Sequence, residues 1–204
     1  MRTRARRLAP GERRAQLLDS AVRAFARRGL NRAGHGDVAR EASVAVPTVF
    51  AYFRARGELV EEVLKKVVGH YTDMADRHYR AENPAPRALL DFAIAFAASV
   101  DTDPDLAAVL LDWSTAIRSE IWPLFLQFHR SMVERIEATI HRGQREGTIP
   151  PEVDANNAAL IIVGSAHLVV QMKFSRTEPE RVHRFLLALL RAAIGPAGFN
   201  AALA

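Results

Sequence analysis

The side chains best suited to catalytic or metal chemistry are seven histidines and a short run of aspartates. Asp101, Asp103 and Asp105 have the alternating spacing that opens a calcium-binding loop, but the glycine that such a loop requires is missing. His70 and His78 lie eight positions apart on one expected helix, too far for a single ion without outside ligands. Motifs of hydrolases, phosphate-binding loops, dinucleotide sites and zinc proteases do not occur. We therefore expect no enzyme, no metal site and no cofactor.

Arginine dominates the N-terminal part of the chain. Residues 1–60 contain thirteen arginines and five acidic residues, a net charge of +8, whereas the whole chain carries +5, so residues 61–204 carry −3. Such an asymmetry fits a polyanion that meets one end of the protein. Charge alone leaves open a nucleic acid, an anionic membrane surface and a merely solvated face.

The spacing of the apolar residues between positions 11 and 60 predicts three helices, which would carry several of these arginines. The first ends at Gly29, the second covers 35–42, and the third follows a three-residue break and covers 46–53, with Pro47 in its first turn. Val49 and Phe53, four positions apart, should face inward. The outward positions of the third helix are then Val46, Thr48, Ala51 and Tyr52. A helix, a short turn and a second helix can present that second helix to a DNA major groove.

The remaining sequence predicts about six more helices and no strand. We expect a helix of about two dozen residues that starts near 57 and is ended by Pro84 and Pro86, followed by helices over 87–100, 104–118, 123–145, 155–173 and 178–194. Asp103 before Pro104 should cap the third of these, and a Gly/Pro-containing tail should follow the last. The fold class is all-α, with a three-helix N-terminal head and a body of about six helices. The expected domains are an arm over 1–10, a DNA-binding head over 11–56 and a regulatory and dimerisation body over 57–204.

Composition points to a globular protein that folds on its own, because 49% of its residues are hydrophobic and 25% are charged. The chain has no cysteine, so neither disulfides nor cysteine zinc sites can form. The apolar run of residues 158–163 is short for a membrane span, and the N-terminus lacks the apolar core of a signal peptide. We expect a cytoplasmic protein that does not enter a membrane.

The segment VAREASVAVPTVFAYFRARGELV, residues 38–60, resembles the signature of the TetR family of transcriptional regulators. The matching positions are Ala39, Val44, Thr48, Phe50, Tyr52, Phe53 and Leu59. Three further segments, RLAPGERRAQLLDSAVRAFARRG, NRAGHGD and DWSTAIRSEIWPLF, resemble the quorum-sensing master regulators of the HapR/SmcR type within that family. The resemblance implies a TetR-like homodimer that binds pseudo-palindromic double-stranded DNA operators as a sequence-specific regulator, of the global, quorum-sensing kind.

The resemblance also implies roles for residues of the head. Thr48 would contact a base edge or a phosphate, Tyr52 a phosphate, and Val46 with Pro47 the methyl groups of thymine. Further phosphate contacts are implied for Arg56 and for the backbone at His35 and Gly36, and minor-groove contacts for an arm that carries Arg4, Arg6 and Arg7. A disordered, solubilising tail is the alternative for the arm.

Three positions depart from the HapR/SmcR type. Ser43 and Ala51 stand where those regulators carry Gln and Asn, and Ala45 stands where they carry a Ser cap. Loss of two amide side chains should shift base readout, so their operators need not be shared. Our hypothesis is that specificity depends here on the arginine arm and on DNA shape.

For the body, the resemblance implies a partner surface and a ligand pocket. Partner contacts are expected from Ile162, Ala166, Val169, Val170, Phe185, Leu186 and Leu189, although plain core is the alternative for each. A pocket for a small apolar ligand of unknown identity is expected at Tyr71, Met74, Trp113, Phe128 and Met132, with Asp112 and His129 as polar anchors. Ordinary core packing is again the alternative.

Two other functions remain open at this point. The chain could be a local, ligand-responsive repressor of a neighbouring efflux or catabolic operon. It could also be a helical module that binds a membrane surface or another protein through its basic N-terminus, which would explain the charge but not the matched head. The sequence leaves open whether the protein activates or represses.

Overall fold

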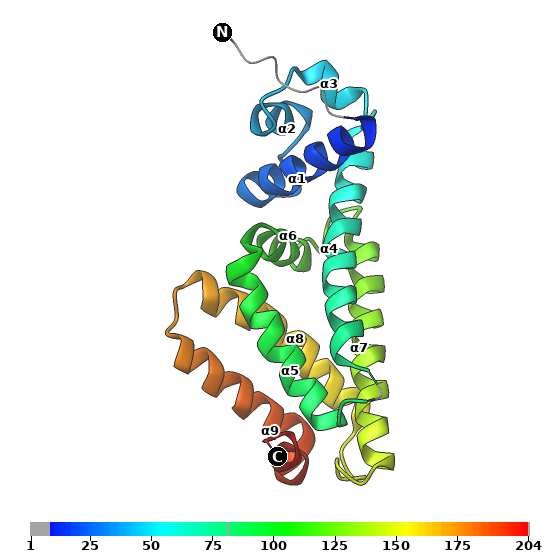
Figure 1. Ribbon diagram of the computed structural model, residues 1–204, viewed down its shortest axis with the longest axis vertical. Helices are drawn as coiled ribbons and strands as arrows, with labels where there is room; N and C mark the ends of the chain where they lie inside the picture. The colour runs from blue at the N-terminus through cyan, green and yellow to red at the C-terminus, as the bar shows by residue number, and fades with distance from the viewer. Residues whose placement is uncertain (1–8, 81, 204) are drawn as a thin grey trace. The chain divides into compact units, whose positions relative to one another are not determined.

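The computed structural model of the chain describes residues 9–80 and 82–203, which form nine helices and no strand (Figure 1). The predicted all-α class, with three helices in the head and six in the body, is confirmed. The chain divides into two compact units between Val67 and Val68, and each is described by itself below. Helix α4, Arg56–His78, contributes to both units. The expected domain limits at 10 and 56 stay predictions.

The first unit contains α1, Pro10–Arg28, α2, His35–Glu41, and α3, Val46–Phe50, together with the first part of α4. At the start of α1 the Ala9 N–H donates to the Glu12 carboxylate at 2.9 Å, and the helix ends at Gly29, whose φ of 83° an L side chain rarely adopts. The third helix is shorter than predicted, because Ala51 and Tyr52 lie in the turn that follows it.

Packing of the first unit centres on fully buried apolar side chains from all four helices: Leu17, Val38, Val49 and Leu59, with Phe53 from the turn before α4. Two ion pairs, Arg14 with Glu62 and Asp19 with Lys66, link α1 to α4. Exposed pairs of this kind stabilise by about 0–1 kcal/mol each, so the apolar contacts hold the unit together.

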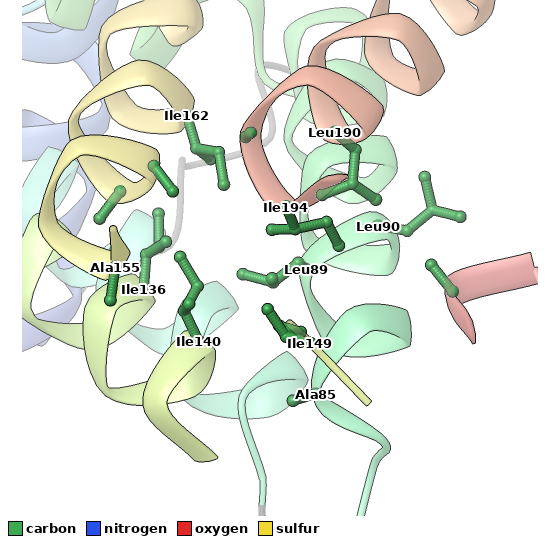
Figure 2. Packing of buried hydrophobic residues seen from close by; sticks show 14 of the residues in the cluster. Ala85, Leu89, Leu90, Ile136, Ile140, Ile149, Ala155, Ile162, Leu190 and Ile194 are labelled. Atoms are coloured by element: carbon green, nitrogen blue, oxygen red, sulfur yellow. The ribbon is translucent and has the colours of Figure 1, made fainter. Parts of the chain in front are cut away.

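The second unit contains α5, Ala85–Thr102, α6, Pro104–Ser114, α7, Trp122–Arg145, α8, Ala155–Phe174, and α9, Pro179–Leu203, besides the end of α4. Its core lies where α5, α7, α8 and α9 meet, around Leu89, Ile136, Ile140 and Ile194 (Figure 2). At Gly143 of α7 a Cβ would lie 2.7 Å from Ile149 Cδ1, so only glycine allows Ile149 to pack this closely.

Several predicted helix ends are corrected. Pro84 and Pro86 do not end α4, which stops at His78, but begin α5. Asp103 precedes α6 as predicted, yet its side chain makes no cap hydrogen bond and accepts one from Thr102 at 2.8 Å instead. Helix α6 ends at Ser114 rather than near 118. The expected tail is helical to Leu203, beyond a kink at Gly195 with a φ of 73°.

Two helices, α8 and α9, are long and apolar enough to cross a membrane by length and composition alone, with 33% of the most apolar window of each buried. The search for uninterrupted apolar runs missed this property, because polar residues such as His167 and Gln171 interrupt α8. Buried helices of globular proteins pass the same test. Both helices pack against α5 and against each other, so part of the apolar surface of each is covered within the fold.

Candidate nucleic-acid interface and body cavity

Helix α3 is held in the head by residues on both of its sides. Val49 and Phe53 are fully buried, as predicted from their spacing. The ring of His35 stacks on Phe50 with 3.9 Å between centroids, and its Nε2 lies 2.8 Å from the Phe53 carbonyl oxygen. Because a carbonyl oxygen only accepts, Nε2 carries the proton. His35 therefore joins the start of α2 to the C-terminal end of α3 and to the turn that follows it.

The turn between α2 and α3 is closed by backbone hydrogen bonds. Ser43 adopts a positive φ of 53°, and the Val44 N–H donates to the Ala39 carbonyl oxygen at 2.9 Å, which ends α2. Ala45 occupies the N-cap position of α3 with the extended backbone typical of caps, but it has no side-chain oxygen to accept from the first turn. The backbone at Ala45 therefore has the geometry of a cap, whereas the side-chain hydrogen bond of a cap is absent, as expected from the sequence.

The outward surface of α3 is mainly apolar. Val46 is 40% exposed and Phe50 47%, and Pro47 and Ala51 are exposed as well. The hydroxyls of Thr48 and Tyr52 are its hydrogen-bonding groups, and neither has a partner among the described residues. This surface can pack on methyl groups and offer two hydroxyls to bases or phosphates. The roles of these residues at DNA stay predictions.

One of the expected phosphate contacts, Arg56, is already engaged within the head, and a carboxylate lies beside the other. The Arg56 guanidinium donates to the Ala33 carbonyl oxygen at 2.9 Å and also to the Leu30 carbonyl oxygen, so it ties the turn before α2 to the start of α4. At the start of α2, the Gly34 N–H donates to Asp37 at 3.2 Å. A phosphate near His35 and Gly36 would meet this carboxylate. Both phosphate contacts remain predictions, and Arg56 would have to make its contact with its other donors.

Most described arginines of the head are paired with carboxylates. Glu41 accepts from Arg23 and Arg27 at 2.8 and 2.9 Å, and Asp37 pairs with Arg28 and Arg40. Such pairing reduces the charge that these arginines offer to a phosphate.

Two exposed arginines differ from the rest of the described head, because the guanidinium groups of Arg32 and Arg54 have no partner there. We did not single them out from the sequence, although Arg54 directly follows the third predicted helix. Arg4, Arg6 and Arg7 lie outside the described residues.

The second unit contains a cavity of about 250 Å³ lined from α4 to α9. Four of the predicted pocket residues line it, namely Tyr71, Phe128, His129 and Met132. Met74 and Trp113 are buried but do not line it, and Asp112 lines a separate shallow groove. Their assignment to the cavity wall is therefore corrected. Trp113 stacks behind Phe128 at 6.0 Å between centroids, and its indole N–H donates to the Ile121 carbonyl oxygen at 3.0 Å.

The polar groups of the cavity wall are few. His167 Nδ1 lies 3.1 Å from Ser114 Oγ, whose own proton is donated to the Leu111 carbonyl oxygen at 2.8 Å, so His167 is the donor. Burial lowers the pKa of His129. Ser114 and His167 were not among the residues predicted to line the pocket, although a lone histidine in the apolar sequence of α8 was a usable signal.

Burial also affects another polar group of the wall, the hydroxyl of Tyr71. It raises the pKa of Tyr71 to about 12, against a smaller opposing effect of Ser99. The Ser99 hydroxyl donates to the Phe96 carbonyl oxygen at 2.7 Å, and the buried Tyr71 hydroxyl has no partner of acceptable geometry in the described chain.

The expected partner surface is corrected by burial at four of its seven positions, whereas Ala166, Phe185 and Leu189 are only partly buried and stay predictions. Ile162, Val169, Val170 and Leu186 are buried in the core of their own chain, and they line the cavity together with Ala166 and Leu189. Phe185 is half-buried. The opposite face of α8 is apolar and exposed. We call it the α8 strip, and it consists of Leu160, Ile161, Gly164, Leu168 and Phe174, with the four large side chains 43–50% exposed. Gly164 also belongs to the cavity lining.

Comparison with known proteins identifies the head. Residues 17–63 match the model of the bacterial regulatory proteins of the tetR family. The HTH-type transcriptional regulator LuxR of Vibrio harveyi is 31% identical over 175 residues, which make up 85% of this chain and 85% of that protein. The chain belongs to the TetR family.

As a TetR-family protein, the chain is a DNA-binding transcriptional regulator and not an enzyme. The matched residues run from the middle of α1 into α4 and include the turn between α2 and α3. The helix-turn-helix assignment made from the sequence is therefore confirmed.

Solved structures show that the TetR fold extends through the body. A TetR-like transcriptional regulator from Rhodococcus sp. RHA1 is similar with a TM-score of 0.77 and 18% identity, over 91% of this chain and 98% of that one. The regulator FadR from Bacillus subtilis in complex with stearoyl-CoA has a TM-score of 0.74, also at 18% identity, over 89% and 98% of the two chains.

Proposed function

We propose that the protein acts as a homodimer on pseudo-palindromic operators and is a global regulator of the quorum-sensing type. The observation that carries this proposal is the similarity to LuxR of Vibrio harveyi, which covers 85% of both chains and so extends well beyond the head. The segment from Asp112 to Phe125, which resembles quorum-sensing regulators, lies in the body. A likeness confined to the head would support DNA binding without this role.

At the operator, α3 of each protomer enters one of two successive major grooves. Thr48 and Tyr52 supply hydroxyls, and Val46, Pro47 and Ala51 supply apolar contacts to base edges. Arg32 and Arg54, whose guanidinium groups are free in the described head, bind phosphates beside them.

The α8 strip supports the dimer. Four large apolar side chains on one helix face, each close to half exposed, lose unfavourable contact with water when a second copy covers them. Gly164 lies within the strip, and a Cβ there would meet no other atom within 4 Å, so the backbone is open to close approach by a partner helix. The partner surface is thus the outward face of α8.

The cavity favours a second candidate, a local ligand-responsive repressor. The similar FadR structure contains stearoyl-CoA, so a protein of this fold can be a ligand-binding regulator. A ligand in the cavity changes DNA binding only if it has a different affinity for two arrangements of the dimer. The two candidates differ in the number of operators, which the next experiment counts.

The test is to incubate the purified protein with fragmented genomic DNA at near-physiological salt and to sequence the retained fragments. Non-specific phosphate binding is weak under these conditions, whereas specific sites survive. Many pseudo-palindromic sites support the global regulator, and one or two sites beside its own gene support the local repressor. A variant with Thr48→Ala and Tyr52→Ala should lose the enriched sites, and no enrichment with the unchanged protein would contradict specific binding.

The arginine arm needs its own test. Replacing Arg4, Arg6 and Arg7 by Ala should weaken operator binding and reduce the preference for flanking A·T pairs. The matched control replaces Arg118, Arg130 and Arg181, exposed arginines of the body, and removes the same charge. If both triple variants bind alike, the arm has no role in specificity.

A further inference from the structure

The cavity of the body has a wall without formal charge. Its lining consists of aliphatic and aromatic side chains with Ser114, Ser165, His129, His167 and Tyr71 as polar members. No Asp, Glu, Lys or Arg among residues 9–80 and 82–203 belongs to this lining. We propose that the cavity selects a small, uncharged and mainly apolar molecule and rejects organic anions of the same shape. This proposal rests on the proposed function only in assuming that the cavity binds a ligand.

Desolvation is the physical basis of this selection. A carboxylate or phosphate that enters the cavity loses its water and finds no cationic side chain to pair with, which is costly in an apolar site. The histidines do not replace that cation. Burial lowers the pKa of His129 and so favours its neutral form, and His167 already donates one N–H to Ser114.

The volume limits the size of the ligand. An engineered apolar cavity of roughly 150 Å³ binds benzene, and sites for drug-sized molecules start at about 300 Å³. At about 250 Å³, this cavity has room for one ring with a short chain or for a medium-length alkyl chain.

Two polar groups of the wall can recognise an uncharged ligand. The Tyr71 hydroxyl is buried without a hydrogen-bond partner, and an unpaired buried donor is destabilising. A ligand hydroxyl or carbonyl that accepts from Tyr71 removes this destabilisation. In the neutral form of His167, Nδ1 carries the proton, so Nε2 remains as an acceptor. An alcohol can satisfy both kinds of group, whereas an alkane satisfies neither.

The experiment compares octan-1-ol with octanoate, which have the same chain length and differ in charge at pH 7.5. Binding is followed by tryptophan fluorescence, because Trp113 packs against Phe125 and Phe128, both of which line the cavity. The chain has two tryptophans, so the variant Trp122→Phe isolates the signal of Trp113. We expect octan-1-ol to bind at least about tenfold more tightly than octanoate.

Variants of the cavity wall show where binding occurs. Ala93 lines the cavity and Ala98 is an exposed residue of the same helix, so Ala93→Phe should abolish the response to octan-1-ol and Ala98→Phe should not. Circular dichroism and the melting temperature establish that both variants fold. Tyr71→Phe should weaken binding of octan-1-ol by roughly two- to tenfold, because it removes one hydrogen-bond donor.

The proposal is overturned if octanoate binds as tightly as octan-1-ol, if neither binds up to the solubility limit of the alcohol, or if Ala93→Phe leaves the response unchanged. An unchanged affinity in Tyr71→Phe would overturn the role of that hydroxyl. Operator binding is measured on the same preparations. Loss of charge selection with operator binding intact refutes this inference alone, whereas absent operator binding refutes the proposed function.

Discussion

The imidazole ring of His35 lies flat on the phenyl ring of Phe50, with 3.9 Å between the ring centroids and 7° between the ring planes. His35 is 8% exposed and starts α2, whereas Phe50 is 47% exposed and ends α3. The stacked pair therefore fixes the orientation of the very short helix α3 through a contact on its exposed face.

Replacing Phe50 by Ala should lower the free energy of unfolding by about 1–2 kcal/mol, since it removes the stacking and part of the apolar burial. Operator affinity should fall as well, because α3 loses one of its supports. Urea unfolding and gel-shift titration measure the two effects. Phe50→Tyr keeps the ring and is the control. Equal behaviour of the two variants would show that the stack does not position α3.

Replacing Ala45 by Ser should raise the free energy of unfolding by about 0.5–2 kcal/mol. Ala45 already has the extended backbone of an N-cap residue, so the new hydroxyl can accept from the first turn of α3 without a change of fold. Ala51→Ser, at the other end of the helix, should have little effect. The expectation fails if both substitutions stabilise the protein equally in thermal unfolding.

Arg54 and Arg56 should respond differently to replacement by Ala. Arg56→Ala removes two charge-assisted hydrogen bonds to backbone carbonyls and should cost about 1.5–3 kcal/mol of stability. Arg54→Ala should change stability by less than about 0.5 kcal/mol and reduce the slope of log K against log salt by about 0.9 for each protomer, or about 1.8 for the homodimer. Thermal unfolding and salt titrations of operator binding check both. A reduced slope in Arg56→Ala would add a phosphate contact to its structural role.

Leu168→Lys should convert the dimer to monomers, because it places a charge in the middle of the α8 strip. Leu126→Lys changes a similarly exposed leucine on α7 and should leave the dimer intact; Leu168 is 50% exposed and Leu126 45%. Light scattering after gel filtration gives the mass of each variant. A dimeric Leu168→Lys variant would move the interface away from the strip.

Acidification should destabilise the protein in two separate pH ranges. His129 has a lowered pKa in the folded state because of its burial, so the unfolded state binds more protons, and stability falls as the pH drops below its ordinary value of 6.5. Hydrogen bonds from Lys65 and Arg14 lower the pKa of Glu62, whose contribution is lost below its ordinary value of 4.5.

His129→Gln should remove the pH dependence of the free energy of unfolding in the upper range only. Replacement of the exposed His141 by Gln is the control and should leave both ranges unchanged. Urea unfolding at a series of pH values measures both variants. An unchanged upper range in His129→Gln would show that another group titrates there.

The sequence was sufficient for features that depend on neighbouring residues. The four-residue spacing of Val49 and Phe53 predicted their burial, and Gly29 marked the end of α1. In helix α8, by contrast, the spacing of apolar residues did not predict which side chains are buried. The helix is apolar on nearly all sides, so periodicity could not separate Ile162, which packs inward, from Ile161, which is 50% exposed.

Contacts between distant residues were also beyond the sequence. Arg56 binds carbonyl groups 23 and 26 positions earlier in the chain, and His167 meets Ser114 at a separation of 53. A residue pattern gives no sign of such partners, so Arg56 was expected to face DNA and Ser114 was not considered. Burial likewise placed Trp113 behind the cavity rather than in its wall.

The apolar surface of α3 limits which feature of a base it can distinguish. Val46, Pro47 and Phe50 carry no hydrogen-bonding group on their side chains, so in a major groove they detect the methyl group at C5 that thymine has and cytosine lacks. A cytosine methylated at C5 presents the same group at the same position. If α3 contacts base pairs in this way, we expect 5-methylcytosine to substitute for thymine there and operator occupancy to respond to DNA methylation.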